Sequence, residues 1–131
     1  MRGFVSDIER LCLENENFRK VLYTGSMSQL VLMSLKPGED IGSEVHTLDQ
    51  FLRCEIGTGK AIVGGVTKKI GTGFAVFVPA GVEHNIVNTS ADLPLKLYTL
   101  YAPPNHQDGV VHRTKEQALG SKEHFDGTTT E

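Results

Sequence analysis

The stretch from Gly38 to Gly57, GEDIGSEVHTLDQFLRCEIG, decides the fold of this chain and its candidate site. Glu44 and His46 are two residues apart, so on an extended strand both side chains leave the same face. Gln50 follows a turn-compatible segment and can point back to the same place from the next strand. A carboxylate, an imidazole and an amide oxygen that converge inside a β-structure predict a site for a divalent metal.

A second stretch, Gly73 to Asn88 (GFAVFVPAGVEHNIVN), supplies another imidazole. Pro79 cannot donate a hydrogen bond to a sheet, so it fits a strand end, and the glycine two residues later permits a tight corner. His84 follows this corner on an apolar strand. We expect His84 to be buried and to meet the side chains of the first stretch.

Length and composition favour one all-β domain. The 131 residues can bury a sizeable core, and 14 glycines and five prolines separate short apolar runs. We expect a single domain over residues 1–131, with a barrel core at about 28–101. The polar segment 102–131 is expected to form a tail that contains a short helix.

Charge and hydropathy exclude several classes of function. The net charge of −3 argues against nucleic acid as a partner and gives no reason to expect an anionic membrane surface. No apolar run is long enough to span a bilayer, and the first ten residues lack the apolar core of a signal peptide, which predicts a cytoplasmic location. Cys12 and Cys54 show no pairing motif and are expected to be reduced thiols.

Short strands at regular spacing, with a turn signal at each junction, predict a sandwich or barrel. Two strands, 30–35 and 74–78, are apolar on both faces and are expected to be covered on both sides. The outer apolar faces of these strands must be buried against something. A second copy of the chain would cover them in a homodimer, and the N-terminal helix is the alternative cover. The expected strands are 18–23, 30–35, 43–46, 51–56, 60–64, 66–70, 74–78, 84–88 and 95–101.

Two capping boxes predict short helices. Ser6 and Glu9 have the spacing of the first box, with a helix to about Leu13. Thr114 and Gln117 fit the second box, with a helix over 115–119. The final residues, 127–131, are expected to fray.

At these residues the sequence resembles the cupin superfamily, and in particular its small single-domain members. The second cupin motif is a glycine, five residues, Pro-x-Gly, two residues, a histidine, three residues and an asparagine. The first motif is a glycine, five residues, His-x-His, three or four residues, a glutamate, six residues and a glycine. The positions that match are Gly73, Pro79, Gly81, His84 and Asn88 for the second motif, and Gly38, His46 and Gly57 for the first. The chain departs from the first motif at Glu44, where a histidine is usual, and at Gln50, where a glutamate is usual.

The resemblance implies a jelly-roll barrel, the cupin double-stranded β-helix, with one divalent metal inside. The implied ligands are Glu44, His46, Gln50 and His84. The two departures keep two imidazoles, one carboxylate and one neutral amide, so the formal ligand charge stays at −1. Two histidines with one carboxylate suit non-haem iron, and manganese, nickel, cobalt and zinc are also compatible.

Each candidate ligand has an alternative role. His84 can be a hydrogen-bonded core histidine, and Glu44 a solvated edge charge. Gln50 can bind the metal or hold a ligand by a hydrogen bond. Asn88 is expected to stabilise a turn or strand end, and Cys54 to face the interior as a packing residue rather than a ligand.

Residues near the end of the last strand are candidates for the pocket. Thr99 and Tyr101 share strand parity and are expected to line it, either as a proton donor or as structural hydrogen-bonding groups. His106, His112 and His124 are expected to be solvated, with His106 as a possible lid residue. Arg53 and Glu55 are expected to form an exposed face.

Three functions from different classes follow. The first is a metal-dependent enzyme, a dioxygenase, lyase or isomerase, acting on a small polar molecule. The second is a non-catalytic binding protein that holds a small ligand on the same metal, and the third is a barrel without metal. The resemblance extends to mannose-6-phosphate isomerase-like cupins, but no inward-facing group of lysines and arginines offers a phosphate site, which ranks a sugar or sugar-phosphate isomerase lower.

Overall fold

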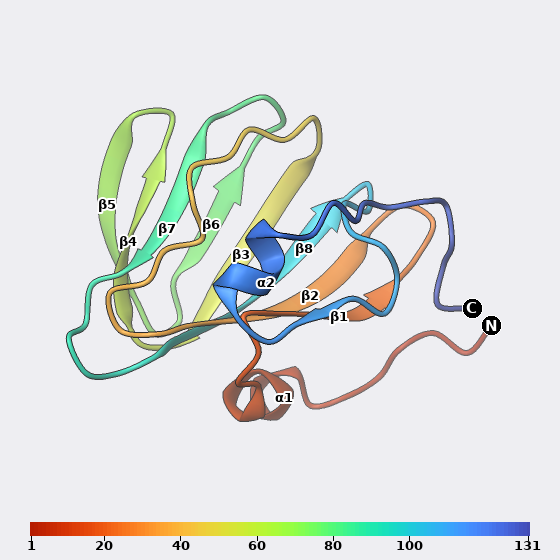
Figure 1. Ribbon diagram of the computed structural model, residues 1–131, viewed down its shortest axis with the longest axis horizontal. Coiled ribbons are helices and arrows are strands. Elements are labelled where there is room, and N and C mark those ends of the chain that lie inside the picture. The colour runs from red at the N-terminus through yellow and green to blue at the C-terminus, as the bar shows by residue number, and fades with distance from the viewer.

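Two antiparallel sheets face each other in the computed structural model, which describes residues 1–131 (Figure 1). The larger sheet has the strand order β6-β3-β8-β2-β1-β9, and the smaller has the order β5-β4-β7. This is the predicted all-β jelly roll. The strands are β1 Arg19–Thr24, β2 Gln29–Leu35, β3 Asp49–Ile56, β4 Thr58–Val63, β5 Val66–Gly71, β6 Ala75–Val78, β7 His84–Asn88, β8 Leu95–Ala102 and β9 Val111–His112.

The apolar core fills the space between the two sheets. Alternate residues of β2, β3 and β8 point inward and meet residues of β4 and β7 from the smaller sheet. The most deeply buried members include Val31, Met33, Leu35, Leu52, Leu95, Leu97 and Ile86. Cys54 belongs to the same cluster, as predicted for a packing residue.

Gly57 shows why a motif glycine is required between β3 and β4. Its backbone has a φ of +117°, a conformation that side-chain-bearing residues rarely adopt. A Cβ at this position would lie 2.8 Å from the carbonyl oxygen of Pro94 and 2.9 Å from Cα of Leu95. The corner therefore brings the β3–β4 turn against the start of β8.

Helix α1 (Ile8–Glu14) covers part of the outer face of the larger sheet, where it packs against β3 and β8. Its N-cap is Asp7, which accepts a hydrogen bond from the amide of Arg10, so the prediction of Ser6 as the cap was wrong by one residue. The helix buries Cys12 completely, and burial together with the nearby Glu55 charge raises the pKa of that thiol to about 12.

Two expectations for the strands were wrong. Residues 43–46 form no strand, because only Glu44 pairs with a neighbour. Glu55 is buried rather than on an exposed face, because it lies on the side of β3 that α1 covers.

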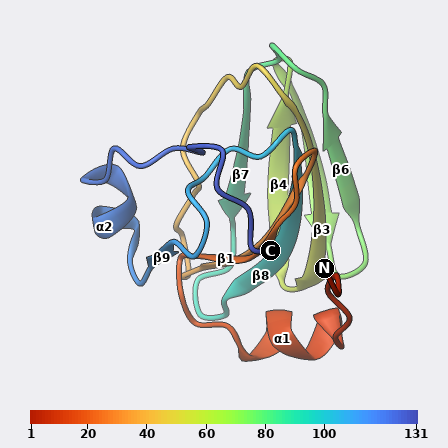
Figure 2. The ribbon, with the colours of Figure 1, turned by 90° about the vertical axis from the view of Figure 1, so that its right-hand side faces the viewer.

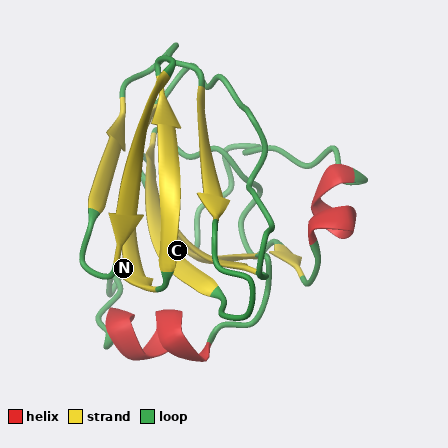
Figure 3. Cartoon of the chain, turned by 90° about the vertical axis from the view of Figure 1, so that its left-hand side faces the viewer, coloured by secondary structure: helices red, strands yellow, loops and turns green.

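The segment after β8 packs against the barrel and returns to its edge. Both helices lie outside the strands, α1 at one end and α2 (Lys115–Leu119) at the side near β9 (Figures 2 and 3). Thr114 caps α2 as predicted. The final residues do not fray, since Thr130 donates its amide to the carbonyl of Thr24 at 2.9 Å and the Glu131 carboxylate accepts from the Tyr23 hydroxyl at 2.7 Å.

Candidate metal centre

A backbone bridge joins the two stretches that the sequence singled out. The amide of Glu44 donates to the carbonyl of His84 at 2.9 Å, and the amide of His84 donates to the carbonyl of Glu44 at 3.0 Å. Residues paired in this way have their side chains on the same side of the sheet. The loop before β3 therefore places Glu44 beside His84 of β7, although the loop forms no regular strand.

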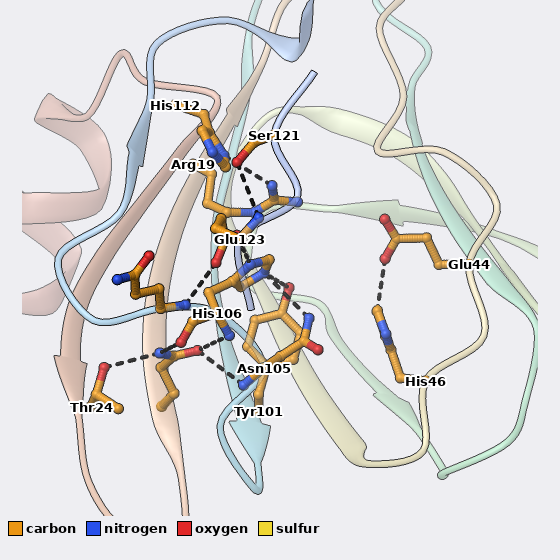
Figure 4. A network of polar contacts seen from close by, with 12 residues as sticks. Arg19, Thr24, Glu44, His46, Tyr101, Asn105, His106, His112, Ser121 and Glu123 are labelled. Carbon is orange, nitrogen blue, oxygen red and sulfur yellow. Dashed lines mark hydrogen bonds and ion pairs between the residues drawn. The ribbon is translucent and has the colours of Figure 1, made fainter. Parts of the chain in front are cut away.

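His46 is held beside Glu44 by the corner that follows β6. Its carbonyl accepts a hydrogen bond from the amide of Gly81 at 2.7 Å. Its Nε2 lies 2.7 Å from Oε2 of Glu44, and Figure 4 shows the two side chains meeting at these ends. Apart from this contact with the carboxylate, the buried nitrogen has no hydrogen-bond partner. Two side-chain atoms that bind the same metal ion lie close together in this way, without a hydrogen bond between them.

The ring of His84 is fixed from behind. Its Nδ1 lies 3.0 Å from the carbonyl oxygen of Val82, an acceptor that places the proton on Nδ1. This leaves Nε2 with a free lone pair, and the ring centre lies 5.2 Å from that of His46. Metal-binding histidines commonly donate their other N–H to a backbone carbonyl in this way.

Gln50 completes the group from the start of β3. Its Nε2 donates to the hydroxyl of Thr99 at 3.0 Å, which turns its Oε1 toward Nε2 of His84 at 3.1 Å. With the His84 proton on Nδ1, two acceptors face each other across this distance. A cation held by both groups would remove this repulsion.

The residues present fit a divalent transition metal. Glu44, His46 and His84 each offer one ligand atom, and the three atoms lie within 4.8 Å of one another. Ligands at about 2.1 Å from one ion are separated from each other by about 3 to 4 Å, so small side-chain shifts suffice. Burial raises the pKa of Glu44, but contact with His46 and the positive charges nearby outweigh it, so the pKa lies below its usual value and the carboxylate is charged.

A hydrogen-bonded chain lies beside this group. Tyr101 is buried with its ring 5.9 Å from that of His46, and its hydroxyl lies 3.4 Å from Nε2 of His106. Nδ1 of His106 lies 2.6 Å from Oε1 of Glu123. Burial raises the pKa of Tyr101 to about 12, so its hydroxyl keeps its proton at neutral pH.

Three residues here were missed or misplaced by the sequence. His106 and His112 are each only 7% exposed, so the expectation that they are solvated was wrong. Arg19 of β1 is also 7% exposed and donates from Nη1 to Nδ1 of His112 at 3.2 Å. Its shared parity with Val21 was the only signal that Arg19 faces inward.

The other predicted residues have plain structural roles or lie elsewhere. Asn88 donates to the carbonyls of Leu35, Lys36 and Leu93, which ties the end of β7 to two loops as predicted. His124 is exposed in the tail.

No helix in the structure combines the length and the apolar character needed to cross a membrane.

Comparison with known proteins agrees with the fold and the motifs. The family model described as Cupin domain matches residues 31–101. The chain is 45% identical over 129 residues to the uncharacterized protein YrkC of Bacillus subtilis (strain 168), covering 93% of this chain and 69% of that protein. It is 42% identical over 122 residues to the uncharacterized protein L612 of Acanthamoeba polyphaga mimivirus, covering 90% of this chain and 76% of that protein.

A solved structure shares nearly the whole architecture. The crystal structure of BH2720 from Bacillus halodurans superposes with a TM-score of 0.89 at 44% sequence identity, covering 92% of this chain and 96% of that one. The matched residues 31–101 contain both motifs and all four candidate ligands. The chain belongs to the cupin domain family.

Proposed function

We propose that this cupin is a metal-dependent enzyme that acts on a small polar molecule. The observation that carries the proposal is the convergence of Glu44, His46 and His84 on one point, with Gln50 Oε1 beside them. The ion would be held by these residues and is a divalent transition metal such as iron, manganese, zinc, nickel or cobalt. When bound, it supplies Lewis-acid polarisation of a substrate oxygen, or an oxygen-activating centre if it is iron.

The chain's own residues supply positioning and a proton. Val82 and Thr99 fix the orientation of His84 and Gln50, so the ligand atoms are held in place before any substrate arrives. Tyr101 holds a proton on its hydroxyl next to His46, and Nε2 of His106, 3.4 Å from that hydroxyl, orients it. Glu123 fixes the ring of His106 from the other side.

The surroundings favour a generic small polar substrate over a sugar phosphate. A phosphate dianion calls for several cations, and Arg19 is the one lysine or arginine whose charge reaches Glu44. A non-catalytic binding protein would use the same ligands. Such a binding protein would hold its small ligand tightly without converting it to a product, whereas the enzyme would consume it.

Spectroscopy and turnover together test this proposal. We would strip the protein of metal, load it with Fe²⁺ or Mn²⁺, and add panels of small hydroxy acids, diols and diketones. We expect at least one class to perturb the spectrum of the metal and to be consumed. Tyr101→Phe should keep the metal and the spectral change but lose most of the turnover. If no compound changes the spectrum of the metal or is consumed, the protein is not an enzyme of this kind. If a compound changes the spectrum but is not consumed, the protein is a binding protein.

The homodimer and the cytoplasmic location stay predictions. An apolar groove of about 460 Å³ between β5 and β6 supports the dimer, because Val66, Phe74 and Phe77 line it and each is more than half exposed. Exposed apolar patches of this kind are typical of protein interfaces.

A further inference from the structure

Arg19 is a buried guanidinium without an anionic partner. Only 7% of the residue is exposed, and no carboxylate oxygen lies within 4.0 Å of it. Its guanidinium donates to Nδ1 of His112 and lies close to the hydroxyl of Tyr101, but Nε has no partner. Burying a charge is costly unless an opposite charge compensates it. A residue kept in this state is expected to have a ligand.

The free part of the guanidinium has the right shape for a carboxylate. Nη1 is used by His112, which leaves Nε and Nη2 along the other edge. Two parallel N–H groups on one edge of arginine bind the two oxygens of a carboxylate. His112 does not neutralise Arg19, because burial and the Arg19 charge both lower the pKa of that imidazole and keep it neutral.

The nearest acidic groups are already used. Glu123 has one oxygen on Nδ1 of His106 and the other on the amide of Gln107, at 2.6 and 2.7 Å. Glu44 lies against His46 in the candidate metal centre. Figure 4 shows the guanidinium of Arg19 and the carboxylate of Glu44 pointing toward each other from opposite sides, with Tyr101 below them.

We propose that Arg19 binds the carboxylate of an anionic substrate, which lies between β1 and the metal centre formed by Glu44, His46 and His84. This inference rests on the proposed function for the role of the metal, but the carboxylate site itself does not require the ion. A carboxylate fits better than a phosphate, because one arginine balances the single charge of a carboxylate, while the carboxylates of Glu44 and Glu123 repel the second charge of a phosphate dianion. The substrate class is therefore a small carboxylic acid that carries a second oxygen group for the metal.

Calorimetric titration tests this inference separately from catalysis. The probes are malonate, succinate and glutarate, their uncharged diamides, and inorganic phosphate, each added to the metal-loaded and the metal-free protein. We expect at least one dicarboxylate to bind, its diamide and phosphate to bind at least tenfold more weakly, and Arg19→Met to weaken the dicarboxylate by about ten- to hundredfold. Arg19→Lys, which keeps the charge but not the paired donors, should give an intermediate loss.

Thermal unfolding distinguishes binding from a structural role. Replacing a buried, unpaired charge with an apolar side chain should leave the melting temperature unchanged or raise it. Arg10→Met, at an exposed ion pair with Glu14, is the matched control and should change neither binding nor stability. Equal dicarboxylate affinity in the parent and in both Arg19 variants overturns the inference, as does phosphate binding more tightly than every dicarboxylate. A parent that holds no metal but still binds a dicarboxylate through Arg19 refutes the proposed function and leaves this site standing.

Discussion

Glu44 and His84 are 40 positions apart in the sequence, yet their backbones exchange two hydrogen bonds, at 2.9 and 3.0 Å, and their side chains meet in the same group of ligand atoms. Glu44 belongs to a loop and not to a strand, so this single bridge fixes its carboxylate. The candidate metal centre thus depends on the pairing between the loop before β3 and the start of β7.

Substitutions of Gln50 test whether its side chain is a metal ligand. Gln50→Glu restores a charged oxygen at the position nearest to His84 Nε2 and should raise metal affinity by about tenfold or more, because it adds a negative charge to the ligand set. Gln50→Leu should lower the affinity. The measurement is competition with a chelator of known affinity.

Thr99→Val is the matched control for the orientation of Gln50. It removes the hydroxyl that accepts from the Gln50 amide and should weaken metal binding by a smaller factor than Gln50→Leu. Equal metal affinity in Gln50→Glu, Gln50→Leu and the parent would exclude Gln50 as a ligand.

Acid should loosen the attachment of α2 to the barrel. Lys115 and Asn85 both donate to the carboxylate of Asp40, and these hydrogen bonds hold its pKa below the usual value. A carboxylate with a lowered pKa stabilises the fold fully above its ordinary pKa of about 4, and the contribution is lost as the pH falls through the folded value. Because the pair is partly exposed, the effect should be below about 1 kcal/mol.

The check is the melting temperature between pH 2 and pH 7 for the parent and Asp40→Asn. The variant should be less stable than the parent at pH 7, and the difference should shrink as the pH approaches 2. A difference that stays constant over this range would show that Asp40 does not act through its charge.

Leu97 tests the core that holds the two sheets together. It is 1% exposed on β8 and belongs to the buried cluster between the sheets. Leu97→Ala should lower the free energy of unfolding by about 2 to 5 kcal/mol, because it removes buried apolar surface and leaves a cavity. Leu93→Ala, at a residue 61% exposed, should change it by less than about 1 kcal/mol. Denaturant titration measures both, and similar losses would contradict the assigned packing.

Phe77 tests the predicted homodimer. Its ring is 59% exposed in the apolar groove between β5 and β6. Phe77→Glu should convert a dimer into a monomer in sedimentation experiments, because a charge at the centre of an apolar interface is desolvated without a partner. A parent that sediments as a monomer at all concentrations refutes the dimer, and a variant that remains dimeric places the interface elsewhere.

Local patterns in the sequence predicted most of the fold and much of the site. The parity of His84, Ile86 and Asn88 gave β7 with its observed bounds, and the spacing of Thr114 and Gln117 gave α2. The motif spacing singled out the four residues that the structure brings together. Each of these signals lies within a short stretch of sequence.

The failures concern contacts made over long distances in the chain. Glu44 has one bridge partner instead of a strand, which depends on how the loop before β3 passes β7. His106 is buried because Glu123, far along the tail, folds back onto it, and a polar segment gives no sign of this. Arg19 lies in an otherwise ordinary strand, and only its pairing with β9 reveals the surroundings of its charge.

Metal content tests the central claim most directly. Elemental analysis of the untagged parent should find about one equivalent of a divalent transition metal, either as purified or after reloading. Glu44→Ala and His84→Ala should each lose it, while Glu116→Ala and His124→Ala, at exposed residues outside the site, should keep it. A parent that holds no metal even after reloading, or site variants that retain it in full, would contradict a metal centre at Glu44, His46 and His84.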